Sequence, residues 1–232
     1  MGAIIRRELN AYFLSPIGYV FLTIYLFITG MAFSVTIQNQ LTNLSEVFGF
    51  LQTIIMLLVP VLTMRLLSEE RKNKSDQALL TAPVSLSAIV YGKYIAAILM
   101  YTLASVMLII YGIVLSVFSP LVWSEFFANF LGTILMGYAL IAVGLFVSSL
   151  TENQVISAIT TFAAVLVLMY MQSFFATADQ FVVDIMNSIA VVARFQSFYS
   201  GTIVFSDVFY FISFIVLFNF LTTRVLERRR YA

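Results

Sequence analysis

The apolar residues of this chain form long runs that are separated by short polar stretches. Between Ile17 and Met64 the only charged residue is Glu46, and no charge occurs from Tyr94 to Ser124. A helix needs about 20 mostly apolar residues to cross a bilayer. The pattern predicts an all-α integral membrane protein whose six transmembrane helices cover residues 17–35, 47–66, 90–118, 126–150, 155–175 and 208–226.

The longest polar stretch, residues 67–94, lies between the second and third apolar runs. Within it we expect a short helix over residues 75–82, because Ser75 suits the N-cap, Asp76 suits the first turn and Pro83 ends the helix. Its residues Ala78, Leu79 and Ala82 share one small apolar face. Such a face on a cytoplasmic loop indicates a protein partner, although a helix that lies on the membrane or on its own subunit has the same pattern.

The segments around the first two apolar runs carry weaker signals. Residues 2–12 alternate apolar and charged positions, which predicts an amphipathic helix on the inner membrane face; a basic topology anchor is the simpler alternative. Pro60 lies inside the second apolar run and predicts a kink, either as a hinge or as a packing adjustment.

In the second half of the chain, Gly137, Gly144 and Ser148 place small residues on one stripe of the fourth span, where another helix can approach closely, in the same subunit or in a partner. Thr151 or Asn153 is expected to cap the fifth span, with Glu152 near the positive end of that helix. Residues 177–206 have apolar positions at helical spacing, which predicts a partly helical outer segment rather than a plain loop.

The basic residues predict the orientation. If both termini lie inside, Arg194 is the only one of the 12 Lys and Arg residues outside. The inner ones are Arg6, Arg7, Arg65, Arg71, Lys72, Lys74, Lys93, Arg224, Arg228, Arg229 and Arg230. Because positive charge resists translocation, this asymmetry predicts both termini in the cytoplasm.

The composition excludes several kinds of chemistry. The chain is 62% hydrophobic and 10% charged, and it has no Cys and no His, which excludes thiolate, zinc-thiolate and imidazole chemistry. It has no phosphate-binding glycine loop, so no bound nucleotide or other cofactor is expected, and a net charge of +1 gives no sign of nucleic-acid binding. No base is available to activate a nucleophile, so we expect neither catalytic residues nor a metal site.

Four stretches in this order, on six spans, resemble the permease subunits of ABC-2 type transporters, in particular the gliding-motility-associated (Gld-type) branch. They are RRELNAYFLSPIGYV, EERKNKSDQALLTAPVS followed by YGKY, LFVSSLTENQVISA, and RFQSFYSGTIVFSDVFYFISF leading to LERRRYA. The resemblance covers the whole chain and implies one ABC-2 transmembrane domain over residues 1–232.

The resemblance also implies a function and a site. A permease of this kind is a membrane subunit that is not itself an enzyme, and it is expected to act as an exporter. A separate dimeric ABC ATP-binding subunit, which binds ATP and Mg²⁺, drives it. The permease lies in the bacterial cytoplasmic membrane and pairs with a second permease, identical or related. The implied ATPase-coupling interface, including the helix over residues 75–82, consists of Glu69, Glu70, Arg71, Ser75, Ala78, Leu79, Thr81, Ala82 and Pro83, with a second cytoplasmic contact at Thr151, Glu152 and Asn153.

Other functions remain open from the sequence. An ATPase-linked membrane anchor that transmits force or signal, in motility or regulation, needs the same spans without moving a substrate. A secondary carrier or a channel is disfavoured because the spans carry no deeply placed ionisable residues of the kind that proton relays use. The sequence does not name a substrate.

Overall fold

The computed structural model describes residues 1–73, 85–174 and 180–231, and every regular element in these ranges is a helix. Within them, six helical segments are long and apolar enough to cross a membrane, which confirms the predicted all-α, multi-pass membrane fold. These are α2 (Pro16–Gln38), α3 (Ser45–Thr63) with its short continuation α4 (Ser68–Lys72), α6 (Leu86–Phe118), α7 (Trp123–Leu150), α8 (Gln154–Phe174) and α11 (Phe205–Tyr231).

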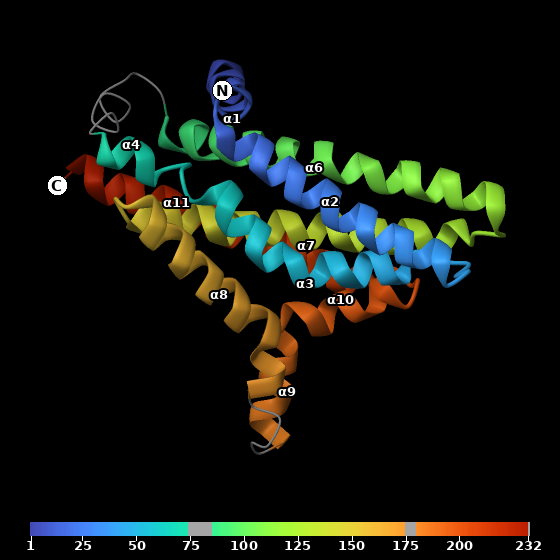
Figure 1. Ribbon diagram of the computed structural model, residues 1–232. Coiled ribbons are helices and arrows are strands. Elements are labelled where there is room, and N and C mark those ends of the chain that lie inside the picture. The colour runs from blue at the N-terminus through green and yellow to red at the C-terminus, as the bar shows by residue number, and fades with distance from the viewer. Residues whose placement is uncertain (74–84, 175–179, 232) are drawn as a thin grey trace.

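The N-terminal helix α1 (Gly2–Leu14) confirms the helix expected over residues 2–12 and ends two residues later. Ser15 is extended and Pro16 occupies the first position of α2, where its missing N–H costs nothing. The chain therefore changes direction at Ser15, and Figure 1 shows α1 steeply inclined to α2, at the end of the bundle that also carries α4 and the C-terminus. Ile4 and Leu9 of α1 pack against the core of the chain itself.

The third span begins earlier than predicted, at Leu86 instead of residue 90. The side chain of Ser85 accepts a hydrogen bond from the N–H of Ala88 at 3.4 Å, so it caps α6. Lys93 can lie inside this helix because acidic side chains neutralise its charge, as described below. The apolar run therefore marks only part of the helix.

Helix α3 ends one turn after its proline, and α4 continues the second span. Helix α3 continues through Pro60 to Thr63, and a turn over residues 64–67 separates it from α4. Because proline lacks an N–H, Pro60 removes the hydrogen bond to the carbonyl one turn earlier, whereas its own carbonyl still accepts the N–H of Met64 at 2.9 Å. The predicted span reached residue 66, and the helix stops three residues short of it.

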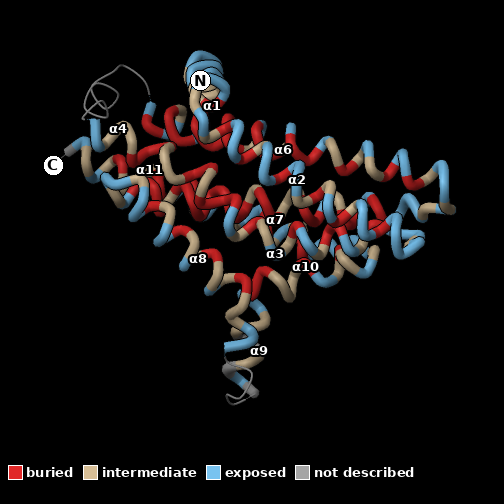
Figure 2. Tube along the Cα trace, in the orientation of Figure 1, coloured by how far each residue is buried: buried red, intermediate tan, exposed pale blue. Residues whose placement is uncertain are grey.

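Helix α7 forms the centre of the bundle and packs against α3, α6, α8, α10 and α11. Figure 2 shows the buried positions concentrated along it. A Cβ atom at Gly137 would overlap the ring of Tyr101 on α6, and one at Gly144 would overlap Thr63 on α3. The stripe of small residues therefore brings α7 close to helices of its own subunit, which decides between the two partners that the sequence left open.

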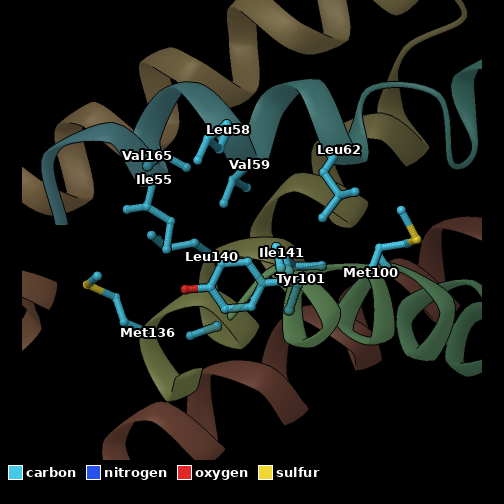
Figure 3. Close-up of a cluster of buried hydrophobic side chains, with 14 of the residues drawn as sticks. Ile55, Leu58, Val59, Leu62, Met100, Tyr101, Met136, Leu140, Ile141 and Val165 are labelled. Atoms are coloured by element: carbon cyan, nitrogen blue, oxygen red, sulfur yellow. The ribbon is translucent and has the colours of Figure 1, made fainter. Parts of the chain in front are cut away.

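The core between α3, α6, α7 and α8 is drawn in Figure 3. Its labelled side chains are Ile55, Leu58, Val59, Leu62, Met100, Tyr101, Met136, Leu140, Ile141 and Val165. The hydroxyl of Tyr101 donates to the carbonyl of Thr133 at 3.0 Å, which joins α6 to α7 by a polar contact. Since lipid tails are as apolar as these side chains, close packing and such hydrogen bonds hold the helices together.

The segment between the last two spans contains two short helices, α9 (Gln180–Ile189) and α10 (Val191–Tyr199). This confirms the partly helical segment, so the plain-loop alternative is wrong. Phe195 and Phe198 of α10 are buried, and both lie against Gly132 of α7. Helix α10 is thus a packed part of the bundle, whereas α9 points away from it in Figure 1.

Candidate functional site

Four charged side chains meet at the bundle end that carries α1 and α4. The Nζ atom of Lys93 on α6 lies 3.0 Å from Glu8 Oε1 on α1 and 2.9 Å from Glu70 Oε1 on α4. Arg7 contacts the same two oxygen atoms, at 2.8 Å for Glu8 and 2.6 Å for Glu70. Two cations and two carboxylates therefore alternate in one closed group, called here the charge clamp, which joins three helices.

The charge clamp is largely shielded from solvent. The Lys93 side chain is 1% exposed, Glu8 is 12% exposed and Glu70 is 15% exposed, while Arg7 is 48% exposed. Burial disfavours the ionised form of Glu8, but Lys93 and Arg7 outweigh this effect and hold the pKa of its carboxyl below the ordinary value. Glu8 is therefore a carboxylate, and the clamp is held by charges in matched numbers.

A second set of contacts fixes α1 to the end of α3. Arg65 approaches Glu69 at 3.1 Å from Nε to Oε2, and its Nη1 donates to the hydroxyl of Ser15 at 2.6 Å. The hydroxyl of the buried Tyr12 donates to the carbonyl of Leu62 at 2.7 Å. Burial, with Glu8 nearby, raises the pKa of Tyr12, so its hydroxyl stays a neutral donor. Helix α1 and Ser15 are thus attached to the end of α3 by hydrogen bonds in addition to the clamp, and the Arg65–Glu69 ion pair joins the turn after α3 to α4.

The clamp borders a polar cavity of about 250 Å³ at this end of the bundle. Its lining residues are Arg7, Glu8, Ala11, Arg65, Glu69, Glu70, Asn73 and Lys93. Three acids and three bases make the lining neutral, and the described part of the chain contains no group of acids that could hold a metal ion. The charged lining residues pair with one another and join α1, the turn after α3, α4 and α6.

The turn between α7 and α8 is also tied to α4. Arg71 donates to the carbonyl of Leu150 at 2.9 Å and pairs with Glu152 at 2.7 Å. The hydroxyl of Ser148 accepts the N–H groups of Leu67 and Ser68, at 3.1 and 3.2 Å. These contacts place Arg71, one of the predicted coupling residues, beside Glu152 of the second predicted contact.

Of the two candidates for the cap of α8, the structure selects Asn153. Its side-chain oxygen accepts the N–H of Val155 at 2.9 Å. The hydroxyl of Thr151 is buried and has no hydrogen-bond partner. Glu152 pairs with Arg71, so its side chain is engaged by α4.

The predicted coupling residues thus divide into two groups. Glu69, Glu70 and Arg71 lie on α4, and each forms an ion pair within the chain. The remaining ones, Ser75, Ala78, Leu79, Thr81, Ala82 and Pro83, lie outside the described residues, as does the helix expected over residues 75–82, and their role stays a prediction.

Sequence reasoning missed the partners that complete the clamp. The sequence pattern indicates only that residues 2–12 are amphipathic and that Arg7 and Lys93 are inner positive charges, and it does not connect them. A signal was present: Lys93 lies eight residues inside α6, where an unpaired charge is costly and requires a partner. The sequence contains several acids near that end, so the spacing alone does not identify Glu8 and Glu70.

The profile of the ABC-2 family transporter protein matches residues 31–226, which is most of the chain. No curated protein matches the chain. The match extends from the second half of α2 to the last turns of α11 and includes α4, the polar segment after it and the α7–α8 turn. With six membrane-spanning helices and a match of this extent, the chain belongs to the ABC-2 transporter family of membrane permease subunits.

Proposed function

We propose that this chain is the permease of an ATP-driven exporter of the gliding-motility-associated branch, in the bacterial cytoplasmic membrane with both termini inside. A separate dimeric ABC subunit binds ATP and Mg²⁺ and hydrolyses the nucleotide, and a second permease, identical or related, completes the pathway. Family membership and the one-sided distribution of Lys and Arg support this proposal.

The charge clamp carries the mechanistic part of the proposal. Residues 74–84, which include the expected docking helix, leave from α4 and return to α6. Glu70 on α4 and Lys93 on α6 join the two sides of this segment, and Glu8 adds α1. A force that the ATPase applies to the segment is therefore delivered to α1, α3 and α6 together, so that these helices move as a body.

Docking of the ATPase on this segment is tested with substitutions at Leu79. Leu79→Asp places a charge on the expected contact face, where an unpaired buried charge costs several kcal/mol. We expect Leu79→Asp to insert into the membrane and pair with the second permease normally, but to lose co-purification of the ATPase. Leu79→Met keeps size and polarity and serves as the control. Wild-type co-purification of Leu79→Asp would contradict docking through this segment.

The transmission of force through the clamp is tested with substitutions at two neighbouring residues, Glu69 and Glu70. Glu70→Gln removes one charge of the clamp, whereas Glu69→Gln removes a 37%-exposed partner of Arg65 whose ion pair contributes only about 0–1 kcal/mol. With ATPase binding retained in both, we expect Glu70→Gln to lose most of the permease-stimulated ATP hydrolysis and Glu69→Gln to lose little. Equal losses in the two variants would show that the clamp does not transmit force.

A further inference from the structure

A cleft lies between α2 and α6 at the end of the bundle opposite α1 and α4, called here the far end. Its volume is about 430 Å³, within the range of small-ligand pockets. The lining residues are Ile37, Gln40, Leu41, Leu115, Phe118 and Ser119. The far end also carries the α2–α3 and α6–α7 turns, which line a neighbouring hollow together.

Helices α2 and α6 are also joined by a pair of aromatic rings near the cleft. The rings of Phe33 on α2 and Tyr111 on α6 stack with centroids 4.5 Å apart and an interplanar angle of 12°. Gly30 leaves room for the Tyr111 hydroxyl, which lies 3.5 Å from the position of a Cβ atom there. From Tyr111 to Phe118, two turns of helix rise about 10 Å. Phe33 and Tyr111 each lie about one helical turn before a lining residue, Ile37 and Leu115, so the stacked rings lie next to the cleft on its side toward α1.

The chemistry of the lining changes from the interior to the mouth. The walls are formed by aliphatic and aromatic side chains, and no charged residue is among the lining residues. Gln40 and Ser119 supply an amide and a hydroxyl, and neither side chain hydrogen-bonds to another described residue. Gln40 also has a left-handed backbone, with φ of 52°, which holds it in a turn just after α2. An occupant needs an apolar chain that carries hydrogen-bond acceptors at one end.

We propose that the cleft binds one phosphatidylethanolamine molecule from the leaflet at the far end. One acyl chain lies between α2 and α6, and the ester oxygens accept hydrogen bonds from Gln40 and Ser119. The bilayer that surrounds these spans supplies such a molecule at high local concentration.

The charges at the far end select the headgroup. Glu46 and Glu125 begin α3 and α7 there, while Arg194 is paired with Asp207 at 3.2 Å. In the described part of the chain, Arg194 is the only Lys or Arg residue on α9, α10 and the turns of this end. The local charge is therefore negative, and it favours a headgroup with an ammonium group over the anionic phosphatidylglycerol.

The test uses the full chain in lipid nanodiscs that contain either phospholipid with a photoreactive diazirine in the acyl chain. Leu115 is 4% exposed and faces the cleft, whereas Leu103, three turns earlier on α6, is 51% exposed. We expect the phosphatidylethanolamine probe to label Leu115 and Leu41 more strongly than Leu103, and the phosphatidylglycerol probe to label Leu115 weakly. Labelling of Leu103 alone would overturn the site, and equal labelling of Leu115 by both probes would overturn the headgroup assignment.

Substitution and native mass spectrometry add a second readout. Leu115→Trp fills the cleft and should remove the phosphatidylethanolamine that stays bound to wild-type protein, whereas Leu103→Trp on the exposed side should keep it. Retention by Leu115→Trp would overturn the proposal. If that variant does not insert, the wild-type labelling pattern still decides. Co-purification of the ATPase should be unchanged in both variants, so failure of the lipid site is distinguishable from failure of the proposed function.

Discussion

The Nζ atom of Lys93 lies 2.9 Å from Glu70 Oε1, and the Lys93 side chain is 1% exposed. Lys93 belongs to the first part of α6 and Glu70 to α4, so this ion pair closes the base of the polar segment between the two helices. The clamp therefore joins the span before the segment to the span after it. Loss of the clamp should therefore lower the stability of the folded protein.

Removing the cation at position 93 should destabilise the protein strongly. Lys93→Met leaves the buried carboxylates of Glu8 and Glu70 with Arg7 as their shared cation, and breaking a buried pair costs about 3–5 kcal/mol. Arg224→Met serves as the control, because Arg224 is 60% exposed and pairs with Glu227 at the surface, where such pairs contribute about 0–1 kcal/mol. Thermal unfolding in detergent, followed by circular dichroism, should show a large loss only for Lys93→Met.

Stability should fall in acid because of Glu8. Its pKa is lower in the folded protein than the ordinary value of 4.5, so the ionised form stabilises the fold above that pH. This contribution is lost as the pH falls from 4.5 through the lower pKa of the folded state. Unfolding temperatures measured across this range should decline in wild type and decline less in Glu8→Gln. Parallel profiles would mean that Glu8 does not contribute.

The close approach of α7 to α3 should make Gly144 intolerant of a side chain. Gly144→Ala overlaps Thr63 and should cost about 1–3 kcal/mol as overpacking. Gly49 is a helical glycine of α3 with more room, because the atom nearest to the position of a Cβ there, the Tyr199 hydroxyl oxygen, is 4.0 Å away. Gly49→Ala should therefore be neutral or slightly stabilising in the same unfolding assay. A neutral Gly144→Ala would contradict the packing.

The cap of α8 should depend on the side chain of Asn153. Asn153→Ala removes the acceptor for the Val155 N–H and should cost about 1 kcal/mol of unfolding free energy. Asn153→Asp keeps an acceptor oxygen and should retain most of the stability. Thr151→Ala, which removes an unpaired hydroxyl, should not reproduce the loss.

The orientation is tested by fused reporters. Fusions at Asn39, Trp123 and Phe181 should report the outer side, and fusions at Lys74, Asn153 and Ala232 should report the cytoplasm, because the basic residues cluster near the second set. A cytoplasmic signal at Trp123 would contradict the proposed topology. Signals reversed at all six positions would place the clamp outside the cell and exclude its contact with a cytoplasmic ATPase.

The sequence by itself determined the fold class, the number of spans and the approximate position of each span. A membrane helix satisfies its own backbone and must be apolar over its whole length, so its signature is local and can be read from consecutive residues. The start of the third span shifted for an identifiable reason. Helix α6 begins at Leu86 because Ser85 caps it and the charge of Lys93 is neutralised.

Only the tertiary structure decided which residues meet. Glu8 and Lys93 are 85 residues apart, and their contact depends on the direction in which α1 leaves Ser15 and on the packing of α6. Likewise, the stripe of small residues on α7 did not show which helix packs closely against it, and only the structure shows that Gly144 lies against Thr63 of the same subunit. Ion pairs and close contacts between distant segments arise from helix packing in three dimensions, whereas hydrophobic periodicity describes one helix at a time.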